Sequence, residues 1–210
     1  MSALVNLADN SNVYEVAKES ALSIAPQLSK RFNNNIYLKR EDDQVIHSFK
    51  LRGAYQKMSS MSEEQKSKGV IASSAGNHAQ GVAFVCKYLH MRGYIFMPVT
   101  TPKQKIDKTL SFGGDNIEIK LTGDYFDNTL KSAMSFSENN DSIFLPPFDS
   151  LAVIEGQATV LAEILSQSGP KNRPDFIFLA VGGGGLSSGM LKYSQEVGSD
   201  INFRLVEPSG

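Results

Sequence analysis

Three short segments of the sequence carry residue types and spacings that could bind an anion or react with a carbonyl group. The first is the glycine run Gly182–Gly185, which follows an apolar stretch at 176–181 and precedes a helical pattern that begins near Leu186. Without Cβ atoms, successive backbone N–H groups can turn into one concavity, and the helix start adds a partial positive charge. This segment predicts a phosphate cradle rather than a flexible connection without a ligand.

Lys50 is the candidate nucleophile. It lies in the segment Ser48–Gly53, which is expected to begin a helix after a charged loop. The positive end of the helix macrodipole disfavours an ammonium there, so it favours the neutral amine that condenses with a carbonyl. On this segment alone, a solvated surface lysine is the alternative, because most lysines are of that kind. We interpret Arg52, two residues further on, as an ordinary ion-pairing residue.

The third segment is Ser73–His78, between the strand-like stretch 69–72 and a helical pattern. Its small residues would let helix-start N–H groups and a hydroxyl approach a carboxylate. Asn77 adds a side-chain amide that can donate to a phenolate-like oxygen. A plain helix cap by Ser74 or Asn77 is the alternative for this segment.

The composition indicates a globular protein whose partner is a small molecule or another protein. The 210 residues are 41% hydrophobic and 20% charged, with a net charge of -1. The chain therefore lacks the excess of positive charge with which proteins bind nucleic acid or an anionic membrane. One cysteine, Cys86, and three histidines without ligand spacing predict neither a disulfide nor a metal site. There is no run of about 18 apolar residues and no leader pattern in residues 1–10. We therefore expect a cytoplasmic protein.

Apolar stretches and helical spacing alternate along the chain. Strands are expected at 35–38, 69–72, 94–99, 117–121, 143–145, 176–181 and 203–206. Helices are expected at 48–61, 77–91, 101–112, 126–139, 151–167 and 186–196. This alternation predicts βαβ units, and hence an α/β fold with parallel sheets. Ligands of such folds bind at the carboxyl ends of the strands, where the three segments fall.

One cofactor, pyridoxal 5'-phosphate, would use all three segments at once. Its aldehyde takes a lysine as a Schiff base, its phosphate takes a glycine cradle, and its ring oxygen takes an amide donor. An amino-acid substrate would bring the carboxylate. A dinucleotide is the alternative, because Gly183, Gly185 and Gly189 form a loose G-x-G-x-x-x-G pattern and Glu207 ends the next strand.

The sequence resembles the threonine ammonia-lyases, which are fold-type II pyridoxal phosphate enzymes, in the segments 48–55, 74–83, 97–102 and 182–186. The likeness spans essentially the whole chain. The acidic pair Glu41-Asp42 and the pair Gln44-Val45, ahead of His47, resemble the biosynthetic form more than the catabolic form or serine racemase.

The resemblance implies a tryptophan synthase β-like fold with two α/β domains built on parallel sheets. Residues 58–150 would form the small domain. Residues 1–57 and 151–210 would form the large cofactor domain, incomplete at its carboxyl end, so that the chain is the amino-terminal part of such an enzyme. Ser20-Ala21 and Ala158 depart from the usual Thr-Pro and glycine of the family, and a tightly packed Ala158 would cost on the order of 1 kcal/mol.

The resemblance also implies the roles of single residues. Lys50 would form the Schiff base, with Phe49 beside the cofactor, and Asn77 would bind the ring hydroxyl. The phosphate would be bound by Gly182, Gly183, Gly184, Gly185 and Leu186, and the substrate carboxylate by Ser74, Ala75 and Gly76.

The activity implied is conversion of L-threonine, with L-serine as a lesser substrate, to 2-oxobutanoate and ammonia for isoleucine synthesis. The full-length enzyme would be a homo-oligomer without metal, nucleic acid or membrane partners. The alternatives are a related serine/threonine dehydratase or serine racemase, a dinucleotide-dependent oxidoreductase, and a fragment without catalytic activity.

Overall fold

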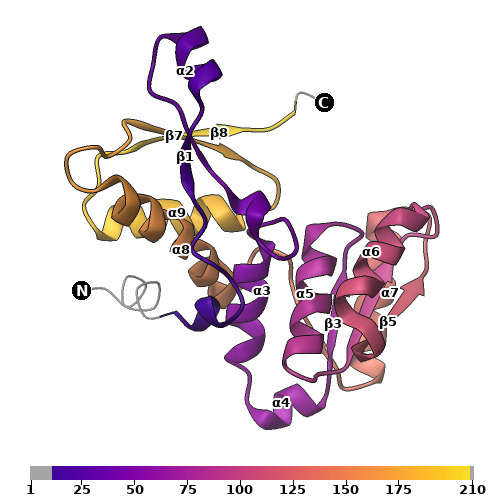
Figure 1. Ribbon diagram of the computed structural model, residues 1–210. Coiled ribbons are helices and arrows are strands. Elements are labelled where there is room, and N and C mark those ends of the chain that lie inside the picture. Colours follow the sequence, from indigo (N-terminus) through magenta and orange to yellow (C-terminus); the bar gives the residue numbers. More distant parts are fainter. Residues whose placement is uncertain (1–10, 209–210) are drawn as a thin grey trace.

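A computed structural model describes residues 11–208 of the chain. The expectation about a leader in residues 1–10 lies outside these residues. Figure 1 shows two groups of strands and helices, with α3 (Lys50–Ser59) between them. Within 11–208, no helix combines the length and the apolar character needed to cross a membrane.

The first group is a parallel sheet with the strand order β5-β4-β3-β6. Its strands are β3 (Val70–Ser73), β4 (Gly93–Met97), β5 (Ile117–Leu121) and β6 (Ile143–Phe144). Its connecting helices are α5 (Asn77–Tyr88), α6 (Lys103–Gly113) and α7 (Phe126–Asn139). The alternation expected from the sequence is therefore confirmed over this part of the chain.

Helices cover both faces of this sheet, because successive side chains of a strand point to opposite sides. Val70 and Ala72 of β3 pack in the core that α5 shares with its neighbours. Ile71, between them, packs with Phe96 of β4 and Ala133 of α7 in a separate core. A strand buried on both faces has an uninterrupted apolar sequence, which is why this stretch was recognisable.

The second group centres on α8 (Leu151–Ser168), which packs against α3 and against α9 (Gly185–Glu196). The parallel strands β7 (Phe176–Ala180) and β8 (Asn202–Val206) are joined through α9. The core of this group is formed by Ala158, Val160, Leu161, Ile164, Leu179, Met190 and Tyr193.

An antiparallel pair corrects the expectation of parallel sheets only. β1 (Leu22–Ile24) pairs with β2 (Tyr37–Lys39), and α2 (Pro26–Phe32) connects them. β1 and α2 were not predicted from the sequence, and the strand expected at 35–38 begins two residues later, at Tyr37. Strands of three residues are too short for apolar alternation to mark them.

Some helices and strands begin or end at other residues than the sequence predicts. The strand expected at 69–72 is Val70–Ser73, because Gly69 has φ +74° and cannot continue an extended strand. The helix expected at 48–61 is shorter and begins at Lys50. The short helices η1 (Asn12–Glu15), η2 (Glu41–Asp43), η3 (Gly114–Asn116) and α4 (Glu63–Ser67) were not predicted. The division into residues 58–150 and the flanking segments stays a prediction.

Candidate active site

Lys50 is the first residue of α3, directly after the N-cap Phe49. Its backbone N–H donates to Ser48 Oγ at 3.2 Å, and its Nζ donates to the carbonyl of Pro147 at 2.9 Å. Burial lowers the pKa of the Lys50 amine from its ordinary value. The direction agrees with the sequence argument, and desolvation of the amine is the cause.

Lys50 and the glycine run line one cavity of about 110 Å³. Its lining residues are Phe49, Lys50, Ala180, Gly182, Gly183, Gly184, Gly185, Leu186 and Ser187. The structure thus brings together two segments that lie about 130 residues apart in the sequence, as a cofactor with an aldehyde and a phosphate requires. Ala180 and Ser187 were not predicted; the signal for Ser187 was a hydroxyl in the first helical turn after the glycines.

The glycine run has the backbone of a tight turn into a helix. Gly184 is the N-cap of α9 and has φ +81°, a conformation that residues with a Cβ rarely adopt. A Cβ on Gly183 would lie 1.9 Å from Cδ1 of Phe148, so that ring packs directly on the glycine backbone. A loop with these properties, which opens into the start of a 12-residue helix, fits a phosphate group.

The segment Ser73–His78 lies at the start of α5 but does not line the cavity. Its N-cap is Gly76, not Ser74 or Asn77, and Ser74 Oγ instead accepts from the Gly76 N–H at 3.1 Å. Asn77 is exposed, and its side-chain amide forms no hydrogen bond within residues 11–208. Its amide is therefore available to a ligand.

α5 lies close to Lys50 along its first turns. A Cβ on Gly81 would lie 3.3 Å from the Lys50 carbonyl oxygen. His78 is buried, and its Nε2 lies 3.2 Å from the Leu145 carbonyl oxygen. Burial, together with the charge of Lys50, lowers the pKa of His78 to about 4, so the ring is neutral at pH 7.

The segment after β6 contributes residues that sequence reasoning missed. The carbonyls of Leu145 and Pro147 accept from His78 and Lys50, and Phe148 covers Gly183. The available signal was position, because the segment follows the carboxyl end of a parallel strand.

Gly189, the third glycine of the dinucleotide pattern, lies where α9 packs on α8. A Cβ on Gly189 would lie 2.4 Å from the Ile154 carbonyl oxygen and 2.9 Å from the Ala158 nitrogen. Gly189 therefore serves the close packing of α9 on α8, and Ala158 packs there fully buried. Among residues 11–208, no group of three or more His, Cys, Asp or Glu side chains could hold a metal ion.

Comparisons with known proteins agree with this geometry. The family described as "Pyridoxal-phosphate dependent enzyme" matches residues 17–210. L-threonine dehydratase biosynthetic IlvA of Bacillus subtilis is 49% identical over 97% of this chain and 48% of its own length. The protein of the same name from Staphylococcus aureus is 45% identical over 93% of this chain and 47% of its own. The chain thus spans about half the length of the curated relatives it matches.

Solved structures show the same fold. The processed form of threonine deaminase isoform 2 from Solanum lycopersicum superposes with a TM-score of 0.92 at 43% identity, over 99% of this chain and 59% of that one. Maize serine racemase superposes with a TM-score of 0.90 at 26% identity, over 99% of this chain and 61% of that one. The expected fold-type II class and the resemblance to biosynthetic threonine dehydratases are confirmed. The chain belongs to the family of pyridoxal-phosphate dependent enzymes.

Proposed function

We propose that this chain carries the cofactor lysine and phosphate cradle of a threonine ammonia-lyase, which converts L-threonine to 2-oxobutanoate and ammonia for isoleucine synthesis. The observation that carries the proposal is the single cavity shared by the buried amine of Lys50 and the glycine run 182–185. The relatives at 43 and 49% identity are a threonine deaminase and a threonine dehydratase, whereas the serine racemase is only 26% identical, which favours threonine as the substrate. L-serine is the expected lesser substrate.

The residues of the site would have different roles in binding the cofactor and the substrate. The backbone of Gly182–Gly185 with Leu186 would bind the cofactor phosphate, and Phe49 would lie beside the cofactor ring. Asn77 would donate to the ring hydroxyl, and the segment Ser74–Gly76 would bind the substrate carboxylate. When bound, pyridoxal phosphate supplies an electron sink for the substrate Cα.

The part of Lys50 in the reaction follows from its environment. It would hold the cofactor aldehyde and, once released, take the proton from the substrate Cα. Burial lowers the pKa of its amine and so favours the neutral form that can accept a proton. The Pro147 carbonyl, 2.9 Å away, would orient the amine toward the cavity.

Further proposals concern the whole protein. We infer a cytoplasmic enzyme that forms a homo-oligomer at full length and acts on a small molecule. The oligomer can be measured by sedimentation of the full-length protein.

Turnover of L-threonine tests the proposed function. With added pyridoxal phosphate, Lys50→Ala is expected to lower 2-oxobutanoate formation by about 10²- to 10⁴-fold, the range for removal of an acid or base group. Lys57→Ala, on the same helix and half-buried, is the matched control and should retain activity. Equal turnover by the Lys50→Ala variant, or turnover of L-serine but not of L-threonine, would contradict the proposal.

A further inference from the structure

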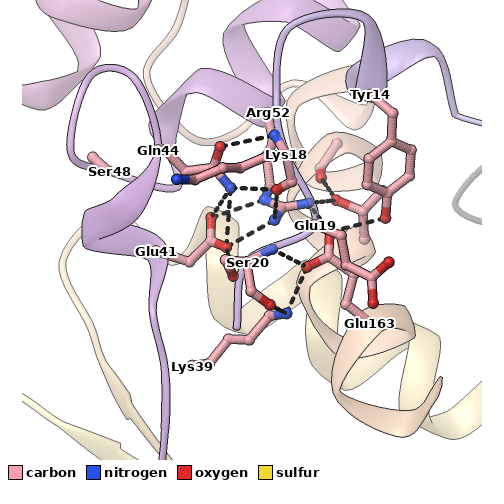
Figure 2. Close-up of polar contacts among 12 residues, drawn as sticks. Tyr14, Lys18, Glu19, Ser20, Lys39, Glu41, Gln44, Ser48, Arg52 and Glu163 are labelled. Atoms are coloured by element: carbon pink, nitrogen blue, oxygen red, sulfur yellow. Dashed lines mark hydrogen bonds and ion pairs between the residues drawn. The ribbon is translucent and has the colours of Figure 1, made fainter. Parts of the chain in front are cut away.

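A cluster of four charged side chains is buried beneath the start of α3. The charge cluster consists of Lys39, Glu41, Arg52 and Glu163, from β2, η2, α3 and α8. The exposed side-chain fractions of Arg52 and Glu163 are 0% and 3%, and those of Lys39 and Glu41 are 9% and 13%. Figure 2 shows that the side chains converge from these separate elements on the Arg52 guanidinium and the Glu163 carboxylate.

Arg52 is held in one orientation. Its Nε and Nη2 donate to the two oxygens of Glu41 at 2.8 and 2.7 Å. Its Nη1 donates to Glu163 Oε1 at 2.5 Å and to Thr159 Oγ1 at 3.0 Å. A planar guanidinium bound at both ends has its direction fixed, which a lysine ammonium could not reproduce.

The other members complete the charge balance. Lys39 Nζ pairs with Glu163 Oε2 at 2.5 Å, so two positive and two negative groups neutralise one another. Tyr14 Oη donates to Glu163 Oε1 at 2.9 Å, and the Ser20 backbone N–H donates to Oε2 at 3.2 Å. Burial tends to raise the pKa of Glu41, but the hydrogen bonds and charge of Arg52 lower it below its ordinary value, so the carboxylate stays ionised.

A contribution to the stability of the fold does not by itself explain why these charges are buried. Burying ions costs desolvation, and well-packed apolar side chains of similar size often stabilise a protein equally well. What the ions add is a defined geometry. That geometry acts on the first turn of α3.

The position of Arg52 links it to Lys50. A helix turns about 100° per residue, so side chains two residues apart point about 200° apart. Lys50 therefore faces the cavity while Arg52 faces the charge cluster. The backbone of this turn is held by hydrogen bonds from the Lys50 N–H to Ser48 Oγ at 3.2 Å and from the Arg52 N–H to the Phe49 carbonyl at 3.0 Å. The Arg52 side chain adds the ion pairs that tie this turn to η2 and α8.

We propose that Arg52, anchored by Glu41 and Glu163, is a positioning residue that sets where the Lys50 amine stands in the cavity. The inference rests on the proposed function, since it concerns the reactivity of Lys50 toward pyridoxal phosphate. That reaction joins the amine nitrogen to the aldehyde carbon through a double bond and releases one water. The reaction requires the Lys50 amine to stand next to the aldehyde carbon. Binding of the cofactor phosphate and ring does not depend on the position of this amine.

The test compares two ligands in the full chain. Pyridoxal phosphate can bond to Lys50, whereas pyridoxine 5'-phosphate has an alcohol in place of the aldehyde and cannot. Arg52→Lys keeps the positive charge but loses the planar guanidinium that binds Glu41 and Glu163 together. This variant should bind pyridoxal phosphate more weakly, relative to pyridoxine 5'-phosphate, by about tenfold or more, because a small misplacement of a reacting group slows or weakens its reaction strongly. Tyr55→Phe is the matched control. It lies buried on the same helix and bonds to Glu15 instead of the charge cluster, and it should leave the ratio unchanged.

Two results would overturn the inference: an unchanged ratio in Arg52→Lys, or an equal fall in Tyr55→Phe. If Lys50 of the unmodified chain forms no bond to pyridoxal phosphate, the proposed function fails. Amide hydrogen exchange then still tests whether Arg52 positions the first turn of α3. Exchange of Leu51 and Gly53 should rise in Arg52→Lys by about tenfold relative to that of Met58 at the other end of α3. An equal rise along the whole helix would overturn the inference without reference to the cofactor.

Discussion

Two basic side chains of different elements, Lys50 and His78, are held by carbonyls of one short segment. Burial lowers the pKa of both, and the charge of Lys50 lowers the pKa of His78 further. Because the Leu145 carbonyl can only accept, His78 Nε2 must carry the proton of the neutral ring. Sequence reasoning predicted Lys50 because of its place at a helix start, but it assigned no role to His78, whose contact lies 67 residues away.

The buried His78 predicts how stability depends on pH. Its pKa is about 4 in the folded protein and 6.5 ordinarily, so the unfolded chain binds a proton first as the pH falls. A lowered histidine pKa therefore makes the protein less stable below pH 6.5, until the folded form is also protonated near pH 4. Between pH 7.5 and pH 5, this group should lower the free energy of unfolding by about 2 kcal/mol.

Urea unfolding of the unmodified protein and of His78→Gln at both pH values measures this contribution. The other titratable groups are common to both proteins, so the difference between the two pH dependences isolates the histidine. Identical pH dependences would show that His78 is not buried in its neutral form.

At the scale of elements, the glycine run and the segment after β6 form one unit. Phe148 packs on Gly183, and a Cβ on Gly185 would lie 2.9 Å from the Phe148 carbonyl oxygen. The sequence predicted the run as a cradle because it joins a strand to a helix. It could not predict the contact with Phe148, because local patterns do not encode which loop lies opposite.

Alanine substitutions at different positions of the glycine run should change the stability of the protein by different amounts. Gly184→Ala should destabilise the protein by about 1–2 kcal/mol, since a positive φ is unfavourable for residues with a Cβ. Gly182→Ala, where no atom lies within 4 Å of the new Cβ, is the control and should change little. Thermal unfolding of the two variants measures the difference. Equal unfolding temperatures would mean that the turn at Gly184 differs from the one described.

At the scale of the molecule, α3 connects the two groups of elements, and the charge cluster fixes it to α8 and to η2. The elements 117–121 and 126–139 were predicted to the residue, because their apolar spacing is strong. Arg52 was interpreted only as an ion-pairing residue, because its partner Glu163 lies 111 residues away. We propose that 58–150 is the small domain, in keeping with the sheet that spans Val70 to Phe144.

The most direct test of the proposed role of Lys50 is to find which lysine bonds to pyridoxal phosphate. Reduction of the loaded protein with borohydride makes this bond permanent, and peptide mass analysis locates the label. The proposed function predicts a label on Lys50, which should be absent in Lys50→Ala and retained in Lys57→Ala. A label on another lysine, or none on the unmodified chain, would contradict it.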